Sequence, residues 1–368
     1  MRPFESLYIH VPFCNAKCDY CAFYSLPGAD AALRRAYLGR LDAELAARAP
    51  LCAPVDSVYV GGGTPSALSA GELAALLSSV RRHLALASDA EVSVEANPHS
   101  LTPEKIAALA GGGVNRVSLG VQSYDPALRR TLGRRGSIDG LDAVLDALRK
   151  TGIDNIGMDL IYAIPGQTAQ GWCADLRRAL GCGIGHLSAY ELTVEEGTRL
   201  AGRAQPETAE DLAVDMWHAA EREARAHGLR RYEVSNMARP GRECRHNRHV
   251  WHGGTYLGCG PAACSFNGEV RYANPADLER WLGGEPPAED RLPPAQRAAE
   301  ILGVGLRTAE GWTADEFRRR TGADYLALAG MELEALAAEG LLALTDRAVR
   351  PTTRGLLFAD MIARRLLY

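Results

Sequence analysis

The sequence predicts an α/β protein: a parallel β/α array followed by a smaller, mainly helical C-terminal domain. Six short β-branched and apolar runs support the array, at residues 7–11, 57–60, 91–95, 116–121, 156–161 and 186–192. Turns and longer amphipathic segments separate these runs, as in parallel β/α units. Right-handed crossovers of such units give either an open doubly wound sheet or a barrel, and strand counting leaves both open.

The helices expected between these strands cover residues 31–49, 70–84, 102–109, 139–150 and 170–180. Thr102 followed by Pro103 is a good start signal for the third of them, because proline suits the first helical position. Another long helix is expected at 209–227. The helix leads to residues 232–236. From there to residue 266 the chain is rich in glycine, histidine and cysteine, and we expect this region to be irregular.

Two proline pairs, at 286–287 and 293–294, indicate a linker. Residues 295–368 are rich in leucine and alanine with helical spacing, and a turn pattern near 341–353 suggests a small β-wing. We therefore expect a first domain at 1–284 that contains the β/α array, and a small helical domain at 285–368.

Length and composition are those of an ordinary globular protein. The 368 residues are 47% hydrophobic, and their formal net charge of −4 gives no general basic field, so we expect no nucleic-acid partner. No segment approaches the roughly 18 apolar residues of a membrane span, and no secretory signal is recognisable, which favours the cytoplasm. Nine cysteines in a reducing compartment favour metal or structural thiols over disulfides.

Three cysteines, Cys14, Cys18 and Cys21, lie within eight residues directly after the first predicted strand. Because this spacing is too close for three separate structural roles, we expect one shared site. Thiolates select iron-sulfur clusters or zinc, and three ligands on a four-iron cluster leave one iron open. A zinc site with a distant fourth ligand and buried inert thiols are the alternatives.

Unusual residues also fall at the ends of the predicted strands, where parallel β/α folds place their ligands. In strand order they are Cys14, residues 61–64, Glu95 with Asn97, Gln122, Asp159 and Thr193. The glycines at 61–63 allow close approach of a ligand to the backbone, although a tight turn is an equally simple explanation. Glu95 suits ribose hydroxyls or an amine, and Arg134 suits a carboxylate. Surface or helix-cap roles are the alternative for these side chains.

The Cys-x3-Cys-x2-Cys spacing after the first strand resembles that of the radical S-adenosylmethionine superfamily. Further motifs narrow the resemblance, at residues 7–14, 61–66, 120–123, 159–162, 165–168 and 256–258. They look like the family that contains the oxygen-independent coproporphyrinogen III dehydrogenases and the HemW haem chaperones. The resemblance covers nearly the whole chain, and it implies a three-quarter, TIM-like barrel of six β/α units.

The same resemblance implies a 4Fe-4S cluster on Cys14, Cys18 and Cys21, with S-adenosyl-L-methionine at the open iron. Its motifs place the S-adenosyl-L-methionine contacts on Tyr8, Tyr20, Gly62, Gly63, Thr64, Glu95, Gln122, Arg134 and Asp159. The cofactor carries the difficult chemistry and the protein supplies placement and electrostatics, so no side chain is assigned a catalytic role of its own.

Two functions compete within the resembled family: haem delivery to client haemoproteins, and oxidative decarboxylation of coproporphyrinogen III. The dehydrogenases resemble Cys-x3-Cys-x2-Cys-x-Cys and carry a long segment before the cluster. Here position 23 is Phe and thirteen residues precede Cys14, and both differences favour a haem chaperone. Whether the chain turns over a substrate stays open at this stage.

Residues 246–251, His-Asn-Arg-His-Val-Trp, resemble the HemW haem motif His-Asn-x-x-Tyr-Trp, with Val250 in place of the tyrosine. The resemblance therefore implies haem as a further ligand, with His246 as the preferred contact. His249, His252 and Cys244 offer other axial ligands, and a lid over the cofactor is the alternative use of this segment. The implied partners are haem, client apo-haemoproteins including membrane haemoproteins reached peripherally, and a second copy of the chain.

Overall fold

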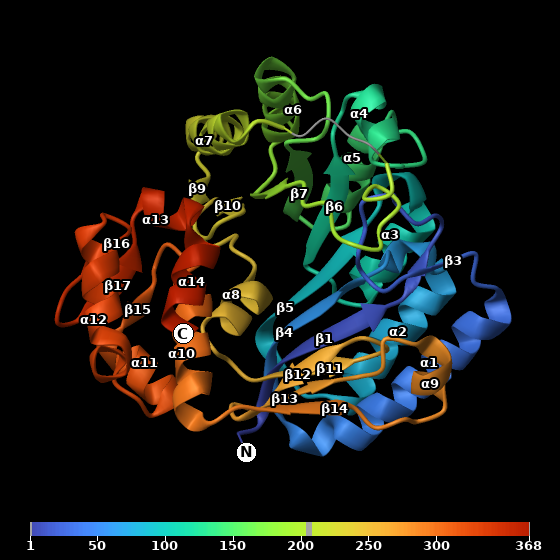
Figure 1. Cartoon of the computed structure of the whole chain (residues 1–368). Coiled ribbons are helices and arrows are strands. Elements are labelled where there is room, and N and C mark those ends of the chain that lie inside the picture. Colours follow the sequence, from blue (N-terminus) through green and yellow to red (C-terminus); the bar gives the residue numbers. More distant parts are fainter. Residues whose placement is uncertain (1, 204–207, 368) are drawn as a thin grey trace.

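A computed structural model of the chain describes residues 2–203 and 208–367 (Figure 1). All six predicted strands are present, and they pair in parallel and in sequence order. They are β1 (Phe4–Val11), β4 (Cys52–Gly62), β5 (Leu86–Ala96), β6 (Arg116–Gln122), β7 (Asn155–Tyr162) and β8 (His186–Glu191).

A seventh parallel strand, β11 (Tyr256–Cys259), pairs with β1 on the side away from β4. It lies in the region expected to be irregular, where four residues that include Gly258 give too short a pattern to recognise. Antiparallel strands extend both edges of the sheet to twelve strands. They are β12 (Cys264–Phe266), β13 (Val270–Ala273) and β14 (Ala288–Arg291) at one edge, and β10 (Asn236–Ala238) and β9 (Arg230–Arg231) at the other.

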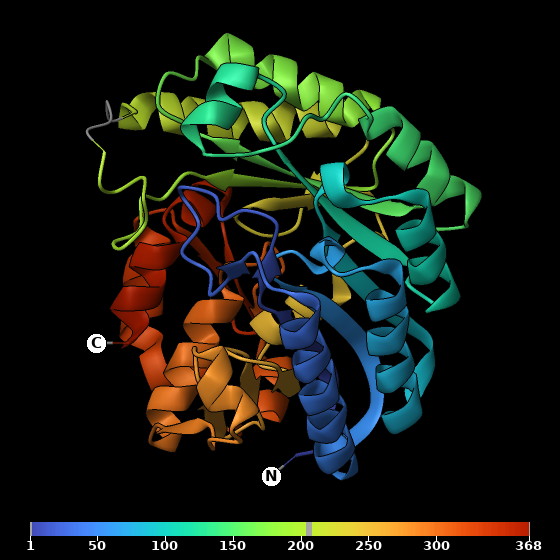
Figure 2. The ribbon, with the colours of Figure 1, turned by 90° about the vertical axis from the view of Figure 1, so that its right-hand side faces the viewer.

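Helices cover the outer face of the curved sheet (Figures 1 and 2). They are α1 (Ala31–Arg48), α2 (Ala70–His83), α3 (Pro103–Gly111), α4 (Pro126–Thr131), α5 (Leu141–Lys150), α6 (Ala169–Gly181) and α7 (Glu210–Ala226). Local sequence explains their starts. Thr102 caps α3 with Pro103 in the first turn, as expected, and Ser69 and Glu72 form a capping box at α2.

The six β/α units form an incomplete barrel. Its edge strands β14 and β9 do not pair with each other in the part of the chain that the structure describes. Leu7, Ile9, Val58 and Val60 are among the residues of the large apolar core, which packs the outer helices against the strands. The predicted fold class, a partial barrel with a smaller helical region, is confirmed.

The C-terminal region is helical with a small three-stranded sheet. It contains α10 (Pro294–Gly305), α11 (Ala314–Thr321), α12 (Tyr325–Ala338), α13 (Thr353–Leu357), α14 (Ala359–Leu367), β15 (Trp312–Thr313), β16 (Leu342–Leu344) and β17 (Ala348–Pro351). The antiparallel β16 and β17 form the expected wing. The second apolar core also takes in Phe266 from β12. The division at 284/285 stays a prediction, and within its two ranges residues 1, 204–207 and 368 lie outside the described ones.

The segment expected to be irregular also contains a short helix, α8 (Arg245–Trp251). Figure 1 shows it between the barrel and the C-terminal region. Among the described residues, no helix combines the length and apolarity that a membrane crossing requires.

Candidate cofactor site

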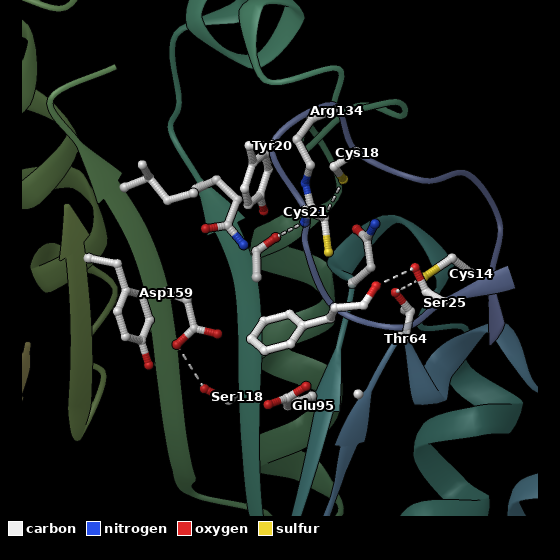
Figure 3. Close-up of a pocket in the computed structure, with 18 of the residues that line it drawn as sticks. Cys14, Cys18, Tyr20, Cys21, Ser25, Thr64, Glu95, Ser118, Arg134 and Asp159 are labelled. Atoms are coloured by element: carbon white, nitrogen blue, oxygen red, sulfur yellow. Dashed lines mark hydrogen bonds between the residues drawn. The ribbon is translucent and has the colours of Figure 1, made fainter. Parts of the chain in front are cut away.

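A cavity of about 610 Å³ opens inside the barrel, within the size range usual for ligand pockets. Its wall combines the cysteine loop with residues from β4 to β8. Eleven predicted site residues line it: Cys14, Tyr20, Cys18, Cys21, Gly62, Gly63, Thr64, Glu95, Gln122, Arg134 and Asp159. Figure 3 shows the cysteines facing Glu95 and Asp159 across this space. Two predicted residues, Tyr8 and His246, are not in its wall.

The cysteine loop is tied to the barrel at both ends. The short strands β2 (Phe13–Cys14) and β3 (Leu26–Pro27) pair in parallel, so the loop leaves and returns at one place. Cys14 Sγ lies 3.5 Å from Thr64 Oγ1, and Cys18 Sγ accepts a 3.7 Å hydrogen bond from Arg134 Nη1. Among the described residues, no three metal-binding side chains meet closely enough to hold a single ion, so the thiols share a cavity without converging on one point.

The glycine turn fixes this loop against β4. Gly63 N–H donates to Val11 O at 2.8 Å, and Thr64 N–H donates to Phe13 O at 2.7 Å. A Cβ on Gly63 would lie only 2.7 Å from Phe13 O and 3.1 Å from Cys14 Sγ, so no larger residue fits without displacing the loop. These two N–H groups therefore hold the cysteine loop and are not free for a ligand. The turn instead allows a ligand to approach the backbone closely.

Two partly buried carboxyl groups face the cavity from β5 and β7, the strands on either side of β6. Tyr59 O–H donates to Glu95 Oε1 at 2.8 Å, yet burial still raises the pKa of Glu95 to about 7. Asp159 accepts a 3.1 Å hydrogen bond from Ser118 Oγ, and burial raises its pKa as well. A cationic ligand would favour the ionised form of both groups, so this wall suits an amine or a sulfonium.

Arg134 and Gln122 lie where β6 ends. Arg134 Nη2 donates to Gly120 O, while its buried Nε has no hydrogen-bond partner among the described residues. Gln122 has a φ of 70°, in the left-handed region that non-glycine residues seldom adopt, and the register with β7 shifts beside it. Such strain at a strand end that faces a cavity is typical of a binding site.

Tyr8 and His246 stand behind the Glu95 wall. Their rings stack with Tyr59, with centroids 6.3 Å apart for Tyr8 and 5.3 Å for His246. His246 Nδ1 is 2.6 Å from Ser6 Oγ, and burial lowers the pKa of His246 to about 3, which keeps the imidazole neutral.

The other proposed haem ligands are held in structural contacts. His249 Nε2 donates to Thr255 O at 2.9 Å, and His252 lies 3.2 Å from both Glu316 and Thr308. Cys244 is buried, which raises the pKa of its thiol to about 12. None of these three side chains is in the cavity wall.

Sequence reasoning missed a second group of cavity residues: Tyr59, Arg116, Ser118, His186, Ser188, Tyr190, Asn236 and Asn247. A signal for some of them is present. Residues 116, 118, 120 and 122 alternate along β6, and residues 186, 188 and 190 alternate along β8, as expected for side chains that face a barrel interior. Phe23, at the position of the dehydrogenases' fourth cysteine, is 71% exposed.

Comparison with known proteins places this site in a family. The family model described as Radical SAM superfamily matches residues 8–179, and the one described as HemN C-terminal domain matches residues 292–358. The heme chaperone HemW of Mycobacterium tuberculosis is 39% identical over 100% of this chain and 95% of its own length. The chain belongs to the HemW family.

Other relatives agree with the assignment to the HemW family. The heme chaperone HemW of Bacillus subtilis is 31% identical over 97% of this chain and 98% of its own length. The mitochondrial radical S-adenosyl methionine domain-containing protein 1 of Bos taurus is 35% identical over 98% of this chain and 87% of its own length.

A solved structure shares the fold. Escherichia coli HemN, described as a coproporphyrinogen III oxidase and a radical SAM enzyme, aligns with a TM-score of 0.83 over 99% of this chain and 90% of its own. At 22% sequence identity this likeness supports the architecture alone.

The residues present fit the cofactors of the radical SAM superfamily. Three soft thiol donors share one cavity wall, which is the ligand chemistry of an iron-sulfur cluster. Beside them lie the partly buried carboxyl groups of Glu95 and Asp159 and the guanidinium of Arg134, whose Nε has no partner among the described residues. Together they suit a ligand that carries an amine, a carboxylate and a sulfonium.

Proposed function

We propose that the protein is a haem chaperone that binds haem and transfers it to client apo-haemoproteins. The observation that carries this proposal is the 39% identity, over the whole chain, to a relative named for that role. Phe23 supports it, because the fourth cysteine of the resembled dehydrogenases is absent at this position.

The cofactors of this proposal are a 4Fe-4S cluster and S-adenosyl-L-methionine. Cys14, Cys18 and Cys21 would hold the cluster. The carboxyl groups of Glu95 and Asp159 and the guanidinium of Arg134 would orient the cofactor beside it, with Tyr20, Gln122 and the 62–64 turn as its other walls. When bound, the pair supplies redox chemistry that no side chain of the chain can supply. Tyr8 would act through Tyr59, since its ring stacks behind the cavity wall.

For haem, His246 remains our preferred contact. Its imidazole is neutral, as metal ligation requires, and Ser6 holds Nδ1 in the manner of a metal ligand whose second ring nitrogen is hydrogen-bonded. Nε2 is then the nitrogen available for iron. Tyr59, which stacks on His246, and the adjacent Asn247 both line the cavity, so this imidazole lies directly behind the cavity wall.

The proposed setting is the cytoplasm, with client apo-haemoproteins as partners. Some clients are membrane haemoproteins that would be met at the membrane surface. A homodimer is also part of the proposal. Size-exclusion chromatography before and after cluster loading tests it, and an unchanged monomer would contradict it.

Anaerobic reconstitution with iron and sulfide, followed by two parallel assays, tests the function itself. We expect stoichiometric haem binding by absorbance, weakened in His246→Gln, with no product from coproporphyrinogen III in the presence of S-adenosyl-L-methionine and reductant. Protoporphyrinogen formation would instead identify an oxygen-independent coproporphyrinogen III dehydrogenase. This is the alternative function, and the fold shared with HemN is compatible with it.

A further inference from the structure

The floor of the cavity contains a buried cation with too few partners. Arg116 lies at the start of β6, lines the cavity and is only 2% exposed. Of its five N–H donors, only Nη1 has an acceptor among the described residues, Ser93 Oγ at 3.5 Å, and Nε is buried without any. No described carboxylate lies within ion-pair distance of its guanidinium, although Glu91, Glu95 and Asp159 are near enough to interact with it electrostatically. Because buried charges are normally paired and hydrogen-bonded, Arg116 has unused capacity for an anion.

A second unused donor lies beside it. His186, 1% exposed at the start of β8, also lines the cavity, and its Nε2 is 2.8 Å from Tyr232 Oη. The Tyr232 oxygen accepts the Cys244 N–H at 3.3 Å. Among the described residues, no acceptor other than His186 Nε2 is in reach of the Tyr232 proton, so we assign that proton to the bond with His186. The proton of the neutral imidazole is therefore on Nδ1, which is buried without a partner. Arg116 is close enough to act electrostatically on both His186 and His246.

This floor is separate from the end of the cavity that holds the cysteine loop. Arg116 and Gln122 are the first and last residues of β6, six residues apart, which corresponds to about 20 Å along a strand. The cluster is proposed at the Gln122 end, and Glu95, the proposed cofactor contact nearest the floor, pairs with Ser118, two residues along β6 from Arg116. The free donors of Arg116 and His186 are thus available to another ligand, or to the distal part of a ligand long enough to reach them.

We propose that Arg116 and His186 form a carboxylate subsite that holds a propionate of haem while the haem iron faces His246. The inference rests on the proposed function and specifies where the protein would bind haem. Guanidinium and imidazole N–H groups are strong donors to a carboxylate in a water-poor setting. Asn236, whose Nδ2 donates to Glu233 Oε1, presents the unpartnered acceptor Oδ1 at the same floor. That acceptor would receive a water that bridges to the carboxylate.

The experiment compares haem with haem dimethyl ester, in which both propionates are blocked, on the reconstituted full chain. The wild type is expected to bind haem at least about ten-fold more tightly than the ester, the effect of a hydrogen bond to a charged group. Arg116→Gln and His186→Gln should each lose most of this discrimination, while Arg222→Gln, an exposed arginine on α7, should retain it. Affinity for S-adenosyl-L-methionine, titrated separately, should be the same in the wild type, His186→Gln and Arg222→Gln. In Arg116→Gln it should change, because the Arg116 charge lowers the pKa of Glu95 and Asp159.

Three results would overturn the subsite. If haem and its dimethyl ester bind the wild type equally, no propionate binds the Arg116 and His186 donors. This comparison uses only the wild type, so it does not depend on whether a variant folds. If Arg116→Gln keeps full discrimination, the propionates bind elsewhere. If Arg116→Gln weakens S-adenosyl-L-methionine and leaves haem binding intact, the carboxylate is that of the methionine moiety. Failure of the proposed function is distinct from these results, because the wild type would then bind neither porphyrin.

Discussion

Cys18 is positioned by contacts that lie outside the apolar core. Its thiol is partly exposed and touches Arg134, and its carbonyl accepts the Cys21 N–H at 3.3 Å. We expect Cys18→Ser to abolish cluster absorbance after anaerobic reconstitution, because a hydroxyl is a poor replacement for a soft thiolate. Far-UV circular dichroism should stay unchanged. Cys264→Ser, at an exposed cysteine on β12, is the matched control and should keep the cluster; global unfolding of Cys18→Ser would contradict the prediction.

Glu95 makes cofactor binding dependent on pH. Its pKa of about 7 means that the carboxyl group is half ionised near neutrality, so affinity for the cationic cofactor should rise between about pH 6 and pH 8. The sign for folding is opposite: the folded apo-protein binds this proton more tightly than the unfolded chain does, so Glu95 lowers stability as pH rises from about 4.5 towards 7.

Equilibrium titration of S-adenosyl-L-methionine at three pH values checks the binding prediction. Glu95→Gln should remove the pH dependence. Tyr59→Phe should move it to higher pH, since the Tyr59 hydroxyl lowers the pKa of Glu95. Wild-type affinity that is constant over this range would show that another group controls binding.

Helix α8 joins the barrel to the C-terminal region. His246 reaches Ser6 on β1, Arg248 pairs with Glu310 at 2.5 Å, and His252 lies between Thr308 and Glu316. His252 also contacts the Trp312 ring, with centroids 5.1 Å apart. The segment with the haem-like motif is therefore a structural connection whether or not it contacts haem.

We expect His252→Ala to lower the free energy of unfolding by about 1–3 kcal/mol, because it leaves buried Thr308 with one hydrogen bond fewer. Chemical denaturation of His252→Ala, Glu316→Ala and the double variant measures the coupling of this pair. Strict additivity of the two single effects would show that the His252–Glu316 contact contributes nothing.

The elements that could be predicted from sequence are those with a local pattern. Strands such as β4 and β6 carry apolar runs, and α3 carries its Thr102-Pro103 start. Helix α8 has six polar or aromatic residues and Val250, with no apolar period, so its contacts with the barrel and the C-terminal region could not be predicted. The cysteines were recognised by their spacing. Arg116 and His186 have no such local signal, because only the folded barrel places them together at the floor of the cavity.

At the scale of the whole molecule, ion pairs with buried or partly buried members connect the edge of the barrel to the C-terminal region. Glu233 is fully buried, and its Oε2 accepts hydrogen bonds of 3.3 Å from Nε and Nη2 of Arg307. Its Oε1 accepts the Ser235 N–H at 2.8 Å, next to β10. Arg271 and Glu300 make a similar connection between β13 and α10. These contacts, together with Phe266 in the second core, hold the C-terminal region beside the cavity floor.

Arg307→Ala should therefore destabilise the whole protein, because the Glu233 carboxylate would stay buried without its cation. Breaking a buried ion pair in this way costs about 3–5 kcal/mol, and the partial exposure of Arg307 places the expected loss near about 3 kcal/mol. Thermal unfolding should show one transition at a lower midpoint. Arg319→Ala, at an exposed arginine of α11, should change stability by less than about 0.5 kcal/mol. If Arg307→Ala instead split unfolding into two transitions, the barrel and the C-terminal region would fold as independent units, and the joint role assigned to Glu233 would be wrong.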